Sequence, residues 1–559
     1  MRKHIGESLL SFRAELLESV GESWKLPPTL RACWNARGAY DPLRFVLRLR
    51  PDIHRELNSV TSGVQEIRHV SFGQVSAFST LLHETVHWWQ HVGSTIGLAL
   101  SLLYPAQAHL NRRHLRTLLA DLGAKKPLLK CKVSPAKAGP PATPVIGTLN
   151  MVLNNWHDME FFRWLVTDPR RVGEFTKDQY FSSVAHSYQI AISSLLWLLG
   201  ATFDPNLSIF PDPRNWEQEF TRLKERQEQG FFPGSNIHLP AMGAREIFEG
   251  QARLCQIQFL HLASGERATW SDFKSLDMLS PPYTTALTIF CELLGVSWPE
   301  SPKSPLVGLF LLFCDISINP AEGIFFEADD IRNFVQRIDP GARFLKLCAI
   351  VRNETGLLDA IKLHSREEYL YASELLCKKA QWKSPLEIAE RINYWAAQYP
   401  PFQDLLEEDR TFTFEPTNLP LRVFFSQLMR YQMDKLKSPE FFCWPGFWTA
   451  ERQSQPSDLE NAKLLFEKHS ALFIDQADGD IYPRLVSGKS NDAIQATFLA
   501  FYSWVAMYDL SRQWIMEDGP FRYNFLWLTS KHPEAEIKQW ATKQFEGAYG
   551  VSPDSFEIL

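Results

Sequence analysis

The sequence has no excess of positive charge and no run of Lys or Arg. It contains 58 Lys and Arg against 64 Asp and Glu, a formal net charge of −6. Proteins that bind nucleic acid in general use a basic excess to neutralise phosphates. The composition therefore argues against that class, and we expect no nucleic-acid partner.

Apolar runs long enough to cross a membrane are also missing. The longest, residues 190–203 and 305–313, fall short of the roughly 20 residues that a spanning helix needs. The first 25 residues carry no unbroken apolar stretch behind their basic start, so a secretory signal is not predicted. Four acidic residues interrupt this stretch: Glu7, Glu15, Glu18 and Glu22. We expect a soluble protein with no membrane partner.

The eight cysteines are scattered and form no CxxC pair. Most lie in apolar helical contexts, which is typical of buried thiols, so a cytoplasmic location without a disulfide framework is predicted. None lies near a helix start with basic neighbours, and glycine-rich phosphate loops are absent. Cysteine-based nucleophilic catalysis and nucleotide binding are therefore unsupported.

Hydrophobic residues, by contrast, make up 45% of the 559 residues, and aromatics 13%. A chain of this length and composition can bury a large core. Helical periodicity dominates, while strand-like alternation is scarcer and is clearest at residues 45–50 and 64–72. We predict a mainly α fold with a small β-sheet (α+β). The sequence has no repeat of fixed period, so a solenoid is not expected.

Two segments interrupt the helical pattern. Residues 125–147 are rich in Pro, Ala and Lys and predict a surface loop or insertion. Residues 399–420 contain four prolines and an acidic stretch, and predict a linker. The resulting division is an N-terminal domain at 1–398, the linker at 399–420, and a helical C-terminal domain at 421–559.

One motif carries recognisable chemistry. Residues 79–93 read STLLHETVHWWQHVG, which contains His83-Glu84-Thr85-Val86-His87, an HExxH pattern inside a predicted helix. Residues i and i+4 lie one turn apart on the same helix face, so His83 and His87 can converge on one metal ion. Glu84 can instead reach a water at the metal and accept its proton. The competing interpretation is a pair of histidines packed on aromatic side chains.

This segment resembles the active-site helix of the zincin metallopeptidases. The resemblance covers only the candidate active-site helices and the strand-like residues 67–72 before the motif. It implies a zincin-like helix embedded in a large helical domain, a Zn2+ cofactor, His83 and His87 as zinc ligands, and Glu84 as catalytic base. The preceding strand is the arrangement expected when an edge strand holds an extended substrate beside the metal.

The zincin subfamilies differ in which residue supplies the third zinc ligand. The metzincin pattern requires Gly and His where this chain has Gln90 and Gly93, so it does not fit. The gluzincin pattern takes a Glu from a later helix, predicted here at residues 243–263. Glu249 is the candidate third ligand, with Glu246 as the alternative.

The run from Glu249 resembles the gluzincin ExxxD element, with Arg253 in place of the Asp. Arginine cannot accept the N–H of a ligating histidine, so the supporting carboxylate must come from elsewhere. Arg253 is instead a candidate for orienting a carboxylate or polarising the substrate carbonyl. Three acidic residues are candidates for the supporting role: Asp158, Glu160 and Asp315.

Two further histidines are candidate site residues. His238 lies on a predicted loop and is a candidate for stabilising an oxyanion, although an ordinary loop histidine is the competing interpretation. His91 lies one turn beyond His87 and could line the pocket or be a fourth ligand; a packed histidine is the favoured alternative.

The sequence therefore predicts a zinc metallopeptidase that acts on a peptide or protein substrate, with a regulatory protein partner as a further possibility. Two alternatives stay open: a helical interaction protein with a structural or non-catalytic zinc site, and a zinc hydrolase of non-peptide amides.

Overall fold

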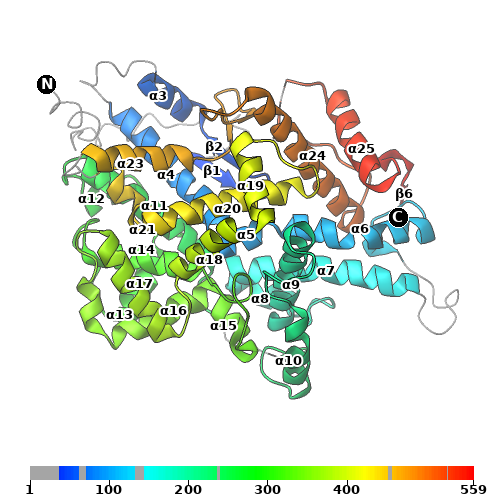
Figure 1. Cartoon of the computed structure of the whole chain (residues 1–559), viewed down its shortest axis with the longest axis horizontal. Coiled ribbons are helices and arrows are strands. Elements are labelled where there is room, and N and C mark those ends of the chain that lie inside the picture. Colours follow the sequence, from blue (N-terminus) through cyan, green and yellow to red (C-terminus); the bar gives the residue numbers. More distant parts are fainter. Residues whose placement is uncertain are drawn as a thin grey trace.

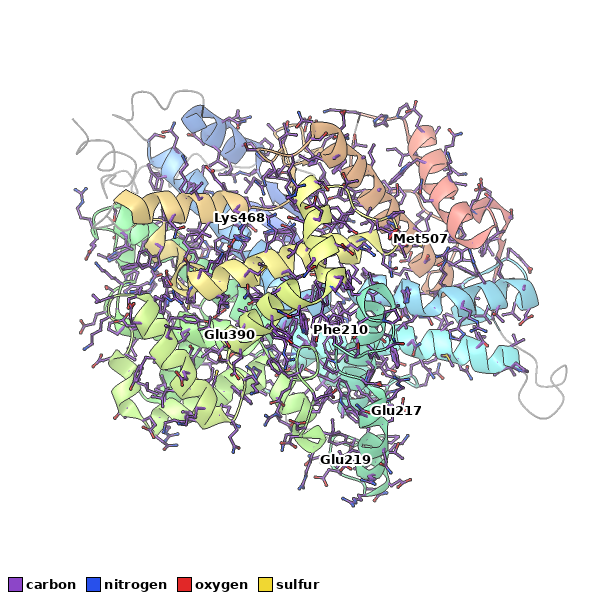
Figure 2. The ribbon with its side chains drawn as sticks, viewed as in Figure 1. Phe210, Glu217, Glu219, Glu390, Lys468 and Met507 are labelled. Atoms are coloured by element: carbon purple, nitrogen blue, oxygen red, sulfur yellow. The ribbon has the colours of Figure 1, made fainter. Side chains whose placement is uncertain are left out.

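The computed structural model describes residues 37–61, 71–131, 144–235, 239–450, 456–525, 527–529 and 531–559. Within these ranges the chain forms packed α-helices and two small β-sheets (Figure 1). The predicted mainly α fold with a small sheet is confirmed. Side chains fill the space between the helices (Figure 2): Phe210 is buried against the ring of Trp395, whereas Glu217 is exposed.

The larger sheet has four short strands in the order β1-β2-β4-β5. Its members are β1 (Gly38–Asp41), β2 (Val46–Leu49), β4 (Phe473–Asp475) and β5 (Ile481–Pro483). The β1–β2 and β4–β5 pairs are antiparallel, and the β2–β4 pair is parallel. A second sheet pairs β3 (Lys125–Lys126) with β6 (Glu557–Ile558).

The strand predicted at residues 45–50 is confirmed as β2. The strand predicted at residues 64–72 lies largely outside the described residues, and its last two positions begin a helix instead. Ser71 is the N-cap of α4 (Phe72–Gly93), in a capping box with Gln74. The predicted loop at residues 125–147 is described only at its ends, where β3 and the first turn of α7 (Pro144–Thr167) lie.

The helix that contains the HExxH motif ends at Gly93, and a second helix begins two residues later. Ser94 adopts an extended conformation after α4 and caps the next helix, α5 (Thr95–Ser101). At Gly97 the backbone approaches the Gln90 carbonyl so closely that a Cβ would lie 1.8 Å from its oxygen. The close approach requires glycine at this position.

Helix α4 lies at the centre of the fold. It packs against α11 (Ala244–Ala263), α20 (Leu419–Lys437), α3 (Pro51–Thr61) and strand β1. Helix α11 also contacts α22 (Pro445–Trp448), where Gly446 meets the Cys255 carbonyl and the missing side chain lets the two helices touch.

The other helices surround this centre. Before α11 come α6 (Leu103–Leu122), α8 (Val172–Phe175), α9 (Val184–Phe203) and α10 (Arg214–Glu225). Between α11 and α20 lie α12 (Trp270–Ser275), α13 (Thr285–Leu294), α14 (Pro305–Ile318), α15 (Phe334–Ile338), α16 (Pro340–Arg352), α17 (Arg366–Ala380), α18 (Pro385–Gln398) and α19 (Pro400–Thr411). Beyond α20 are α21 (Pro439–Cys443), α23 (Pro456–Lys468), α24 (Asn491–Met516) and α25 (Glu534–Tyr549).

The structure corrects the linker predicted at residues 399–420. This segment forms α19 and the start of α20, and Phe402 and Leu405 of α19 are buried. Prolines in the first turn of a helix remove only N–H groups that would have no partner within the helix, so they begin α19 rather than preventing it. Residues on both sides of this segment share one hydrophobic core, and β2 pairs with β4 across it.

One described helix, α9, is long and apolar enough to cross a membrane by length and composition. Two-thirds of its most apolar window, 67%, is buried inside the fold. This burial is typical of a core helix in a soluble protein.

Candidate metal centre

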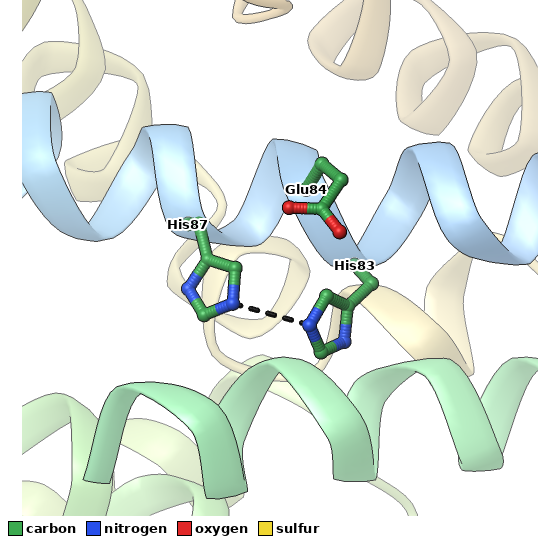
Figure 3. Close-up of side chains that lie close together, drawn as sticks. All are labelled: His83, Glu84 and His87. Carbon is green, nitrogen blue, oxygen red and sulfur yellow. Dashed lines mark hydrogen bonds between the residues drawn. The ribbon is translucent and has the colours of Figure 1, made fainter. Parts of the chain in front are cut away.

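The two histidines of the HExxH motif converge on one point beside α11. Both project from the same side of α4, and their Nε2 atoms lie 3.1 Å apart (Figure 3). The carboxylate of Glu249, on α11, approaches the same point, with its Oε2 3.4 Å from Nε2 of His87 and 3.8 Å from Nε2 of His83. The structure thus brings together the three residues predicted as ligands.

The spacing of these three donor atoms fits a zinc ion. Two ligands about 2.05 Å from a tetrahedral centre lie about 3.3 Å from each other. The three separations, 3.1, 3.4 and 3.8 Å, bracket that value. Two imidazoles and one carboxylate are also the donor set of a catalytic zinc site, which keeps its fourth position for water or substrate.

The donor atoms open onto a cavity of about 950 Å³. Its lining comes from α4, α11, β1 and the loop before α13. His83 and Glu84 are almost fully buried, while Glu249 is partly exposed to this space. A small molecule or a short stretch of peptide can therefore reach the three donors.

Gln90 orients His87. Its side-chain oxygen accepts a hydrogen bond from Nδ1 of His87 over 2.7 Å, which leaves Nε2 free to bind a metal. The Gln90 amide nitrogen donates in turn to the Phe248 carbonyl and to Gln251, both on α11. The sequence analysis does not predict this role for Gln90. The one indication in the sequence is the i, i+3 spacing of His87 and Gln90, which places both side chains on the same helix face.

The prediction that an acidic residue supports a ligating histidine is wrong, because each of the three candidates contacts other residues. Asp158 accepts a hydrogen bond from Ser187, and Glu160 pairs with Arg163. Asp315 is buried against Lys435 and Tyr369. An amide therefore replaces the carboxylate expected beside a ligating histidine.

Glu84 is buried between α4 and strand β1. One of its carboxylate oxygens and one ring nitrogen from each of His83 and His87 all lie within 4.8 Å of one another. A Cβ at Gly38 would come within 2.7 Å of the Glu84 side chain, so this glycine makes room for it. Burial raises the pKa of the Glu84 carboxyl to about 7, against the opposing effects of His87 and the Tyr40 backbone N–H. A carboxyl group with this pKa can both accept and return a proton near neutral pH.

The described edge strand beside the site is β1; of the segment predicted at residues 67–72, residues 67–70 lie outside the described residues. β1 contacts α4 and contributes Gly38, Ala39 and Tyr40 to the cavity. Among the described strands, it has a neighbour on one side only. Its four residues are too short for an alternation pattern to identify them in the sequence.

Glu246, the alternative third ligand, lies away from the histidines. Its carboxylate accepts hydrogen bonds from the Gly243 backbone N–H at 3.0 Å and from Arg170 at 2.7 Å. These contacts make it part of the N-terminal cap of α11.

Arg253 lies in the cavity, one helical turn beyond Glu249. Its guanidinium group stacks over the ring of Tyr283 at 3.9 Å and donates to the side-chain oxygen of Gln256. His238, predicted as an oxyanion stabiliser, lies outside the described residues.

His91 is packed rather than aimed at the donors. Its ring contacts those of Tyr40 and Phe248, and Nδ1 lies 3.3 Å from the Ser101 hydroxyl. Burial lowers the pKa of His91 to about 3, so its imidazole is neutral. No described cysteine lines the cavity.

Metal binding is expected to release a proton from His87. Burial lowers the pKa of this imidazole, but the adjacent Glu249 carboxylate raises it to about 9. His87 is therefore charged below pH 9 in the metal-free protein, and a metal must displace its proton. We expect about one proton released per zinc at pH 7.5, and zinc affinity that rises about tenfold per pH unit toward pH 9. Calorimetric titration in buffers of different ionisation enthalpy measures the release; a heat independent of the buffer would contradict it.

Comparison with known proteins gives this chain no family: no protein-family model, no curated protein and no solved structure matches it.

Proposed function

We propose that this protein is a zinc-dependent metallopeptidase of gluzincin type. The observation that carries the proposal is the convergence of His83, His87 and Glu249 at tetrahedral spacing on an open cavity, with Glu84 buried beside them. Zn2+ is the cofactor that this donor set favours.

Each residue then has a defined role. His83, His87 and Glu249 hold the zinc ion, which when bound supplies Lewis acidity toward a carbonyl group and lowers the pKa of water. Glu84 accepts the proton of the attacking water and returns it to the leaving amine. Gln90 keeps the His87 imidazole in the tautomer that presents Nε2.

A peptide is the substrate that strand β1 favours over other amides. An extended peptide can add to the edge of a sheet through main-chain hydrogen bonds. β1 is such an edge, and its residues line the cavity that contains Glu84. A peptide paired with β1 would pass directly beside the zinc ligands.

The same proposal includes a cytoplasmic location. The described cysteines are all free, and six of the seven are buried. Thiols kept in this state are typical of a reducing compartment. A protein substrate or a regulatory protein partner would then be encountered in the cytoplasm.

The test is metal content together with turnover on the full chain. Purified protein is analysed for zinc and incubated with a complex peptide library, and new termini are identified by mass spectrometry. We expect one zinc per chain and cleavage that stops on chelation and returns with added zinc. Zinc without cleavage would favour a non-catalytic site in an interaction protein, or a hydrolase of non-peptide amides. Absence of zinc after refilling would exclude the metallopeptidase.

A further inference from the structure

We propose that Arg253 binds a carboxylate group of the substrate, so that the enzyme selects peptides with an acidic side chain or a free C-terminus beside the scissile bond. This inference rests on the proposed function and names the substrate class for the same site.

The Arg253 guanidinium is held in a fixed position. One face lies on the ring of Tyr283 at 3.9 Å, and its NH1 donates to the Gln256 side chain over 2.5 Å. Gln256 is itself anchored on α4 by a hydrogen bond to Ser79. A cation positioned in this way needs little further ordering to bind a ligand.

No described carboxylate forms an ion pair with Arg253, although the charges of Glu84 and Glu249 lie near enough to interact with it. Its contacts are a neutral amide and an aromatic ring, and its Nε is buried without a hydrogen-bond partner among the described residues. Because a buried donor without an acceptor is costly, a ligand oxygen at this position would be stabilising. A carboxylate matches the planar fork of a guanidinium group.

A second arginine adds positive charge to the same cavity. Arg37 lines it from the residue before β1. Burial lowers the pKa of Arg37 to about 10, and the charges of Arg50 and Arg253 contribute to the shift. The cations at positions 37 and 253 therefore repel each other, and an anion bound beside them would relieve this repulsion.

The position of Arg253 sets where the carboxylate binds. Arg253 lies four positions after Glu249, a rise of about 6 Å along α11. A group bound there would belong to a residue next to the scissile bond. The carboxylates of Glu84 and Glu249 lie in the same cavity, so a doubly charged phosphate would be disfavoured relative to a single carboxylate.

Matched peptide pairs test the inference. One pair has Glu or Gln at the position next to the cleaved bond, with an amidated C-terminus. The other pair has neutral side chains and ends in a free carboxylate or an amide. We expect the wild type to prefer the acid of at least one pair by about tenfold or more in kcat/KM. The pair that shows the preference identifies the source of the carboxylate.

In Arg253→Gln, the preference is expected to fall below about threefold while cleavage of the neutral peptides continues. Arg222→Gln, on the exposed surface of α10, is the matched control and should keep the full preference. Equal rates for acid and neutral substrates in the wild type, or an undiminished preference in Arg253→Gln, would overturn the inference.

A binding measurement separates this inference from the proposed function. Two pairs of short ligands are titrated into chelator-treated protein and followed by ligand-observed NMR. The first pair is N-acetyl-Ala-Glu-amide and N-acetyl-Ala-Gln-amide, and the second is N-acetyl-dialanine and its amide. In the wild type, at least one acid should bind more tightly than its neutral partner. In Arg253→Gln, that acid and its neutral partner should bind with equal affinity. If zinc and cleavage are absent but this difference persists, the peptidase proposal fails and the carboxylate site stands. Equal binding of acid and neutral forms in both pairs overturns the carboxylate site.

Discussion

Replacement of Glu84 by glutamine is expected to lower kcat/KM by about 10²- to 10⁴-fold while zinc stays bound. Glutamine has nearly the size of glutamate and can still accept the Tyr40 backbone N–H, so it fits between α4 and β1. It cannot accept a proton from water. The three donor atoms of His83, His87 and Glu249 are unchanged, so the metal content should remain one per chain.

The substitution is also expected to leave the fold intact. Glu84 is 5% exposed, and burial raises the pKa of its carboxyl to about 7. Because the folded-state pKa lies above the unfolded one, this group costs the metal-free protein stability as the pH rises from about 4.5 toward 7. Glutamine removes that cost, so the free energy of unfolding above pH 7 should not decrease.

Three measurements check this result on the same preparations: kcat/KM on a cleaved peptide, zinc by elemental analysis, and urea denaturation. Glu217→Gln, on the exposed face of α10 (Figure 2), is the control and should match the wild type in all three. Full activity in Glu84→Gln would remove this residue from the mechanism. Loss of zinc together with activity would make it a structural residue of the site.

The part of the site that the sequence predicted depends on local spacing. His83 and His87 are one turn apart on a single helix, so their convergence follows from helix geometry alone. Glu249 was found because a short run beside it resembles a known element, not because the sequence indicates that α4 and α11 touch. Their contact depends on the packing of the whole core, which a local pattern does not encode.

The incorrect and missing predictions have the same cause. The role of Gln90 depends on the Phe248 carbonyl and on Gln251 across the helix interface, which no pattern within α4 indicates. Strand β1 has four residues and pairs with β2, and neither its length nor its composition distinguishes it from a loop. The proline content of residues 399–420 predicts a linker, but the buried Phe402 and Leu405 show that burial of apolar side chains decides the structure.

The largest effect on metal binding is expected from Glu249→Ala, and its matched control is Glu246→Ala one turn earlier on α11. Oε2 of Glu249 lies 3.4 and 3.8 Å from the two histidine nitrogens. Loss of a group that only orients a ligand weakens metal binding about 10- to 100-fold. Loss of a ligand itself should exceed about 100-fold, and dialysed Glu249→Ala should retain less than about 0.1 zinc per chain.

Glu246→Ala should show the opposite pattern. Its carboxylate caps α11 through the Gly243 N–H and pairs with Arg170. Without these contacts the protein should lose about 1–2 kcal/mol of unfolding free energy but keep its zinc. Elemental analysis and urea denaturation of both variants separate the two roles.

Zinc lost from Glu246→Ala and kept by Glu249→Ala would mean that α11 presents a different face to the histidines. Zinc kept by both would leave His83 and His87 in need of another third ligand. Only the predicted pattern, with zinc lost at Glu249 and stability lost at Glu246, agrees with a metal ion held between α4 and α11.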